Sequence, residues 1–170
     1  SQHSVLLAHV ACCLAKEMSW GSDSTFSKLV LGAFMHDVSL QNPKIAKLNS
    51  LKQLEAVKGE FSDTEVKAFQ LHPSTAADLV RTMQEIPPDV DLIVLQHHER
   101  PDGSGFPRGL LPNYIAPLSV LFIVAHELTQ QMMERADQFS LPEFVESNKA
   151  VFNGGNFKKV FAALEKMQVT

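Results

Sequence analysis

Apolar residues recur along most of this chain at the three- and four-residue spacing of an amphipathic helix, and this periodicity restricts the fold more than any other feature. In residues 3–18 the pattern runs through Val5, Leu6, Val10 and Leu14. The alternation of apolar and polar residues that is typical of a half-buried strand never extends beyond a few positions. The sequence therefore predicts an all-α fold.

Turn residues and capping signals divide the chain into a series of expected helices. Ser62-Asp-Thr-Glu65 has the form of a capping box that opens a helix ending near Leu71, and Pro73 fits the first turn of the next helix. Glycine and proline are frequent in residues 100–112, which we expect to form a loop. The expected helices span residues 3–18, 26–38, 62–71, 73–83, 90–98, 116–133, 142–149 and 157–166.

Length and composition indicate one globular domain. No internal repeat, low-complexity tract or linker divides the chain, so residues 1–170 are expected to form a single compact helical domain. The chain is 45% hydrophobic and 20% charged, unlike collagen-like, disordered or disulfide-stabilised chains. It has 15 Lys and Arg against 19 Asp and Glu, a net charge of −4, and no basic cluster. A DNA-binding role is therefore not expected.

Cysteine usage and apolar run length indicate the compartment. Cys12 and Cys13 are adjacent in a helical pattern, where a disulfide would be strained, so free thiols and a cytoplasmic location are expected. The longest apolar stretch, residues 120–125 with its flanks, has about half of the ~20 residues that a membrane helix needs, so no membrane insertion is expected. Because the first residue is not Met and the chain begins at the edge of a helix, we expect a fragment of a longer protein.

Histidine is the residue type whose placement suggests chemistry. His9 lies on the apolar stripe of its helix, which favours a core or boundary role. The other histidines fall where the expected helices begin or end, and helix ends can converge in a bundle. Taken singly, such residues are more often caps, surface pairs or hydrogen-bonded core residues than metal ligands. Together they form a candidate dinuclear metal site of six imidazoles and one bridging carboxylate: His3, His36, Asp37, His72, His97, His98 and His126.

Two motifs resemble those of a known family. His36-Asp37 resembles the dyad that defines the HD superfamily of metal-dependent phosphohydrolases. Residues 97–110, which read His-His-Glu-Arg-Pro-Asp-Gly-Ser-Gly-Phe-Pro-Arg-Gly-Leu, resemble the signature of its HD-GYP branch, the cyclic di-GMP phosphodiesterases. The resemblance covers essentially the whole chain in order. It implies a compact helical bundle of the HD-domain type around a dinuclear metal site.

The resemblance also implies a ligand set. It makes His3, His36 and Asp37 ligands of one metal, and Asp37 would bridge to a second metal. His72, His97 and His98 would hold that second ion, and His126 stands where the family has a final Asp ligand. Two transition-metal ions are therefore expected, because imidazole-rich sites suit Fe, Mn, Co, Ni or Zn better than Mg or Ca. Among these ions, the resemblance favours iron, with manganese next.

Further roles follow from the same resemblance. Arg135 occupies the position of an arginine that holds a substrate phosphate. Glu99 either hydrogen-bonds a ligand imidazole or is a solvated carboxylate, and Asp102 braces the loop or a ligand histidine. Gly103 and Gly105 allow a close backbone approach or a positive φ, or are an ordinary turn. In the Gly105-Phe106-Pro107 triad, the Phe106 ring either packs the loop against the bundle or contacts a partner protein.

The chain departs from the family pattern at three positions. Leu40 replaces a lysine that follows the dyad, Phe106 replaces the tyrosine of Gly-Tyr-Pro, and His126 replaces the aspartate. These departures leave two main interpretations open. The first is an active phosphodiesterase that hydrolyses cyclic di-GMP to pGpG, with GMP as the product of further cleavage. The second is a metal-binding but catalytically impaired module that senses the nucleotide or binds a partner. A helical interaction domain without metal is the third alternative.

Overall fold

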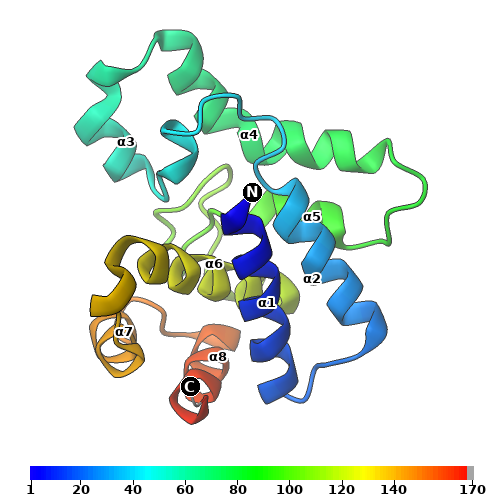
Figure 1. Ribbon diagram of the computed structural model, residues 1–170. Coiled ribbons are helices and arrows are strands. Elements are labelled where there is room, and N and C mark those ends of the chain that lie inside the picture. The colour runs from blue at the N-terminus through cyan, green and yellow to red at the C-terminus, as the bar shows by residue number, and fades with distance from the viewer. Residues whose placement is uncertain (168–170) are drawn as a thin grey trace.

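The computed structural model describes residues 1–167, and within them the fold is entirely helical, as expected (Figure 1). The elements run along the chain as α1 (Gln2–Glu17), α2 (Asp23–Met35), η1 (Ile45–Lys47), α3 (Leu51–Val57), η2 (Lys58–Glu60), α4 (Asp63–Arg81), α5 (Val90–Gln96), η3 (Pro112–Tyr114), α6 (Pro117–Arg135), η4 (Ala136–Gln138), α7 (Leu141–Asn148) and α8 (Gly155–Lys166). The η elements are short 3-10 helices. In this described part of the chain, no helix is long and apolar enough to span a membrane.

Helix α6 is the centre of the bundle. Every residue from Ser119 to His126 is buried. This part of the helix is apolar on nearly all sides, as is typical of a helix surrounded by other elements. Helices α1, α5 and α8 pack directly against it (Figure 1). The main core therefore surrounds α6, and His126 enters the protein interior from the middle of this helix.

Helix α4 corrects the expectation of two helices separated at Pro73. A single helix runs from Asp63 to Arg81 and contains Pro73 in its interior. Proline lacks an N–H, so the carbonyl of Phe69, four residues earlier, loses its usual helical donor. That carbonyl lies 2.5 Å from Nδ1 of His72 instead. The side chain of His72 thus replaces the missing backbone donor, and the helix continues. The capping box at Ser62 and Glu65 is confirmed.

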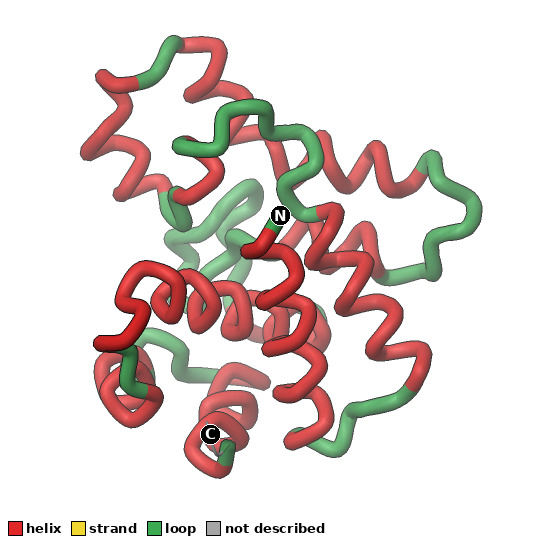
Figure 2. The backbone as a smooth tube through the Cα atoms, viewed as in Figure 1, coloured by secondary structure: helices red, strands yellow, loops and turns green. Residues whose placement is uncertain are grey.

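Residues 41–61 hold helical structure that the sequence reasoning missed. Ser50 begins α3 by accepting a hydrogen bond from the Gln53 amide at 3.1 Å. Ile45 and Leu54 are buried with Phe69 and Phe106 in a small separate core. The segment after α2 and the signature loop after α5 are in direct contact (Figure 2). Residues 41–61 therefore lie next to the histidine cluster rather than on a remote surface.

Candidate metal centre

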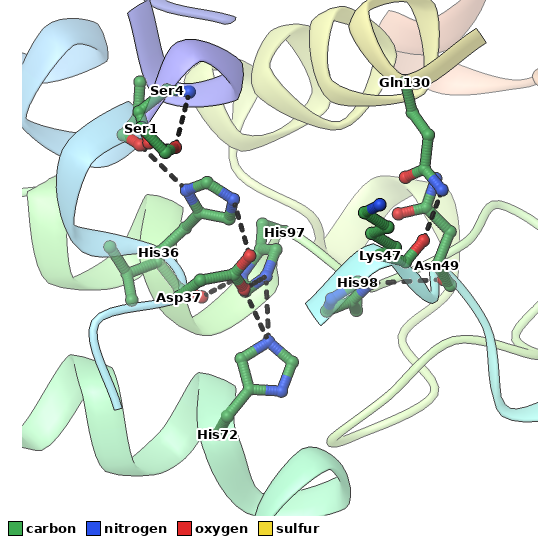
Figure 3. A network of polar contacts seen from close by, with 12 residues as sticks. Ser1, Ser4, His36, Asp37, Lys47, Asn49, His72, His97, His98 and Gln130 are labelled. Atoms are coloured by element: carbon green, nitrogen blue, oxygen red, sulfur yellow. Dashed lines mark hydrogen bonds and ion pairs between the residues drawn. The ribbon is translucent and has the colours of Figure 1, made fainter. Parts of the chain in front are cut away.

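The six candidate histidines and Asp37 converge from five helices. His3 lies in the first turn of α1, His36 caps the end of α2, and His97 and His98 follow the last turn of α5. His72 and His126 correct the expectation that every ligand lies at a helix end, because they project from the middle of α4 and α6. Figure 3 shows His36, Asp37, His72 and His97 facing one another. His9 takes no part in this cluster and lies near Cys13.

The cluster forms two groups that could each hold a metal ion. One consists of Asp37, His72, His97 and His98, and the other of His3, His36 and His126. Asp37 faces both groups with different oxygens. Its Oδ2 lies 3.2 Å from Nε2 of His36, and its Oδ1 lies 3.3 Å from Nε2 of His72. A carboxylate in this position can bridge two ions.

Backbone carbonyls fix the orientation of four of the imidazoles. Nδ1 of His36, His72 and His97 contacts the carbonyl three residues earlier in its own helix, at 3.0, 2.5 and 2.6 Å. Nδ1 of His98 contacts the carbonyl of Asn49 at 3.1 Å. Because a carbonyl only accepts, each Nδ1 carries the proton and each Nε2 presents a lone pair. This arrangement is typical of metal-ligating histidines.

The buried lone pairs fit a metal ion better than an empty core. Nε2 of His72 and Nε2 of His97 lie 3.2 Å apart, so two lone pairs face each other unless a cation lies between them. Nε2 of His36 faces the Asp37 carboxylate at 3.2 Å, and Nδ1 of His126 is buried without a hydrogen-bond partner among the described residues. Leaving such groups unpaired in the protein interior costs about 1–3 kcal/mol each. Bound ions would give Nε2 of His36, His72 and His97 a partner.

Burial and mutual repulsion hold most of the cluster neutral. Desolvation lowers the pKa of His97, His98 and His126 well below the ordinary value, and neighbouring imidazoles lower it further. Desolvation also lowers the pKa of His3. Burial acts in the same direction on His36, but the charge and hydrogen bond of Asp37 outweigh it and raise the pKa. Burial opposes ionisation of Asp37, yet the neighbouring His36 makes its pKa fall well below the usual range.

We expect the metal-free protein to lose stability as the pH falls below about 6.5. An unfolded histidine takes up a proton near that pH, whereas folded His97, His98 and His126 do not. As the pH falls below about 6.5, each such histidine lowers the free energy of unfolding by about 1.4 kcal/mol per pH unit. The raised pKa of His36 acts in the opposite direction and increases that free energy. Urea denaturation in chelator at pH 7.5, 6.5 and 5.5 measures this. A denaturation midpoint that rises towards pH 5.5 would contradict it.

The two carboxylates of the signature loop, Glu99 and Asp102, bind the loop itself rather than the candidate ligands. Both expectations for Glu99 are wrong, because its carboxylate is buried and accepts hydrogen bonds from the amides of Arg108 at 2.9 Å and Leu110 at 2.8 Å. Asp102 is exposed and accepts from the amide and hydroxyl of Ser104, so it braces the loop and touches no histidine. Gly103 has a φ of +78°, which favours glycine.

Phe106 packs against the cluster. Its ring is 5% exposed and stacks on the His98 imidazole, with ring centroids 4.6 Å apart and an angle of 12° between the planes. This is the first of the two expected roles, and it leaves the ring no surface for a partner protein. Gly105 permits this close approach, because a Cβ there would lie 2.5 Å from the His98 carbonyl oxygen. The Phe106 amide donates to that carbonyl at 3.1 Å. Pro107 is half-buried next to it.

A cavity of about 620 Å³ opens onto His3, His36 and Asp37. Leu40 and Lys47 are among the residues that line it. Arg135, expected to hold a substrate phosphate, is not. Its guanidinium lies 3.8 Å from the carboxylate of Glu143 on α7, and its side chain is half exposed. The structure therefore brings the seven candidate ligands together but places Arg135 outside the cavity.

Sequence reasoning missed a buried polar network beside His98. The Asn49 carbonyl accepts from both His98 and the Arg100 guanidinium, the latter at 3.2 Å. The Asn49 side chain donates to Glu127 at 3.1 Å, and Arg100 lies 3.4 Å from the same carboxylate. The helical spacing of Ile45, Leu48, Leu51 and Leu54 was the sequence signal that could have revealed this segment.

Comparison with known proteins identifies the family. The HD domain family model matches residues 2–140, most of the chain. This chain belongs to the HD domain family. The fold that the resemblance implies is confirmed as well, since a solved structure, "Bd1817, a HDG"Y"P protein from Bdellovibrio bacteriovorus", superposes on this HD domain with a TM-score of 0.71. That likeness covers 98% of this chain and 51% of the other, at 21% identity, and concerns the fold.

Two curated proteins are similar in sequence to this HD domain. One is cyclic di-GMP phosphodiesterase PA4108 of Pseudomonas aeruginosa, 26% identical over 69% of this chain. The other is cyclic di-GMP phosphodiesterase response regulator RpfG of Xanthomonas campestris pv. campestris, 28% identical over 75% of this chain. The chain matches only 26% and 32% of the lengths of these relatives.

Proposed function

We propose that this HD domain is a metal-dependent phosphodiesterase that hydrolyses cyclic di-GMP to pGpG, with GMP as the product of further cleavage. The observation that carries the proposal is the position of Asp37, whose two oxygens face two separate groups of imidazoles at one side of a cavity. Similarity to two cyclic di-GMP phosphodiesterases supports the choice of substrate.

In the proposed site, the metal ligands and the residues around them have different roles. His3, His36 and His126 would hold one metal ion, His72, His97 and His98 the other, and Asp37 would contact both. When bound, such ions acidify water and neutralise phosphate charge. The backbone carbonyls at Nδ1 orient the imidazoles so that Nε2 is the atom that would bind metal, and Phe106 excludes water from one face of His98. The nitrogen-rich donor set suits a transition-metal ion, and among such ions the resemblance to HD-GYP domains favours iron, then manganese.

A second candidate is a metal-binding module that senses cyclic di-GMP without hydrolysing it efficiently. Leu40 is the observation that favours it, because this apolar side chain lines the cavity three residues after Asp37. A cation there would have helped to bind the phosphate, and Leu40 provides none. In either case we place the domain in the cytoplasm, attached to an N-terminal sensory or regulatory domain, as the response-regulator name of one relative suggests.

Metal analysis followed by a nucleotide assay tests the proposal. The protein is expected to hold two transition-metal ions per chain by elemental analysis after anaerobic reconstitution with iron or manganese. The loaded protein should convert cyclic di-GMP to pGpG, detected by chromatography, and chelation should abolish the conversion. Binding without conversion would favour the sensor. Protein that retains no iron, manganese, zinc, nickel or cobalt would refute both candidates.

A further inference from the structure

Lys47 is the only lysine or arginine among the described residues that line the cavity over His3, His36 and Asp37. It ends the short helix η1, in the segment that the sequence reasoning left unassigned. Its side chain is exposed, and no carboxylate in residues 1–167 forms an ion pair with it. Lys47 is therefore available to bind an anionic ligand that enters the cavity beside the candidate metal ligands.

The backbone of Lys47 is held in place from two sides. The Gln130 side chain on α6 donates a hydrogen bond to the Lys47 carbonyl (Figure 3). Two residues further on, the carbonyl of Asn49 accepts from His98 and Arg100. Lys47 therefore lines the cavity from a backbone that is tied both to α6 and, through Asn49, to one of the candidate ligands.

The remaining cavity residues give a phosphate no other positive side chain. Leu40 is apolar, and Arg135 is turned towards Glu143 outside the cavity. Glu134 lines the cavity too, but its carboxylate accepts from Gln130 at 3.0 Å rather than pairing with Lys47. An anionic phosphodiester that reaches the candidate metal ligands must therefore find its ammonium partner in Lys47.

We infer that Lys47 binds a phosphate group of the substrate and so supplies the cation that Leu40 and Arg135 do not. The inference rests on the proposed phosphodiesterase function. A lysine acts here as a point charge, and the charge-assisted hydrogen bond it donates strengthens binding of a phosphate oxygen. Lys47 contributes to specificity for phosphate diesters and holds no metal ion.

Substitution in the full, metal-loaded chain tests the role of Lys47. Lys47→Gln is expected to weaken binding of cyclic di-GMP roughly 10- to 100-fold by calorimetry and to raise KM more than it lowers kcat. Metal content and melting temperature should stay as in the wild type, and binding should lose part of its dependence on salt concentration. Lys47→Arg should recover most of the affinity. Lys44→Gln removes an exposed lysine of the same turn that does not line the cavity, and should bind as the wild type does.

A second probe separates this inference from the proposed substrate. Bis(4-nitrophenyl) phosphate is a phosphodiester without a nucleobase. If the wild type does not bind cyclic di-GMP but binds or cleaves this probe in a Lys47-dependent way, the cyclic di-GMP proposal fails and the role of Lys47 stands. If Lys47→Gln binds cyclic di-GMP as tightly as the wild type does, with full metal content, the role of Lys47 is refuted. If the loaded wild type binds neither probe, both proposals are refuted.

Discussion

Asp37→Ala is expected to remove most bound metal and to lower kcat for cyclic di-GMP by at least about 100-fold. The reason is that Asp37 lies within 3.3 Å of Nε2 atoms in both imidazole groups, so its loss weakens two positions at once. A single substitution such as His98→Ala removes a donor from one group only. Elemental analysis and a chromatographic assay on the same preparations measure the two effects.

Asp137→Asn is the matched control for Asp37→Ala, since it removes an exposed carboxylate in η4, away from the cavity. It should keep two metal ions and wild-type activity. Full occupancy of both positions in Asp37→Ala would show that Asp37 is not a bridging ligand. Loss of metal in His98→Ala as severe as in Asp37→Ala would show that the two positions do not fill independently.

Gly105→Ala is expected to lower the free energy of unfolding by about 2–4 kcal/mol. A Cβ at this position would lie 2.5 Å from the His98 carbonyl oxygen and 2.5 Å from Cα of Glu99, and would also meet the Arg100 nitrogen. All of these are backbone atoms, so no side-chain rotation can relieve the clash. The loop must move away and take Phe106 off the His98 imidazole.

Gly59→Ala is the matched control, because a Cβ there would meet nothing within 4 Å. It should leave stability unchanged within about 0.5 kcal/mol or raise it slightly, as Gly-to-Ala changes do at unstrained positions. Urea denaturation of both variants in chelator compares them without the contribution of bound metal. Equal midpoints for Gly105→Ala and the wild type would mean that the loop does not lie against residues 98–100 in solution.

The sequence alone determined the all-helical fold and the set of candidate ligands, because both can be recognised from short stretches of the chain. The apolar spacing within each helix does not depend on what the helix packs against. Imidazole and carboxylate donors are likewise recognised by residue type, and the dyad and the 97–110 signature are contiguous in the chain. One local expectation was wrong, because a single helix continues through Pro73 where the sequence predicts two. His72 contacts the carbonyl that the proline leaves without a backbone donor.

Only the tertiary structure decided which side chains surround the candidate ligands. The Asn49 carbonyl meets Arg100 across 51 residues of sequence, and the Asn49 side chain meets Glu127 across 78. Lys47 likewise meets Gln130 across 83 residues beside the cavity, and the packing of α7 turns Arg135 towards Glu143. Contacts of this kind depend on how whole helices pack together, and the spacing of residues within one segment carries no record of them.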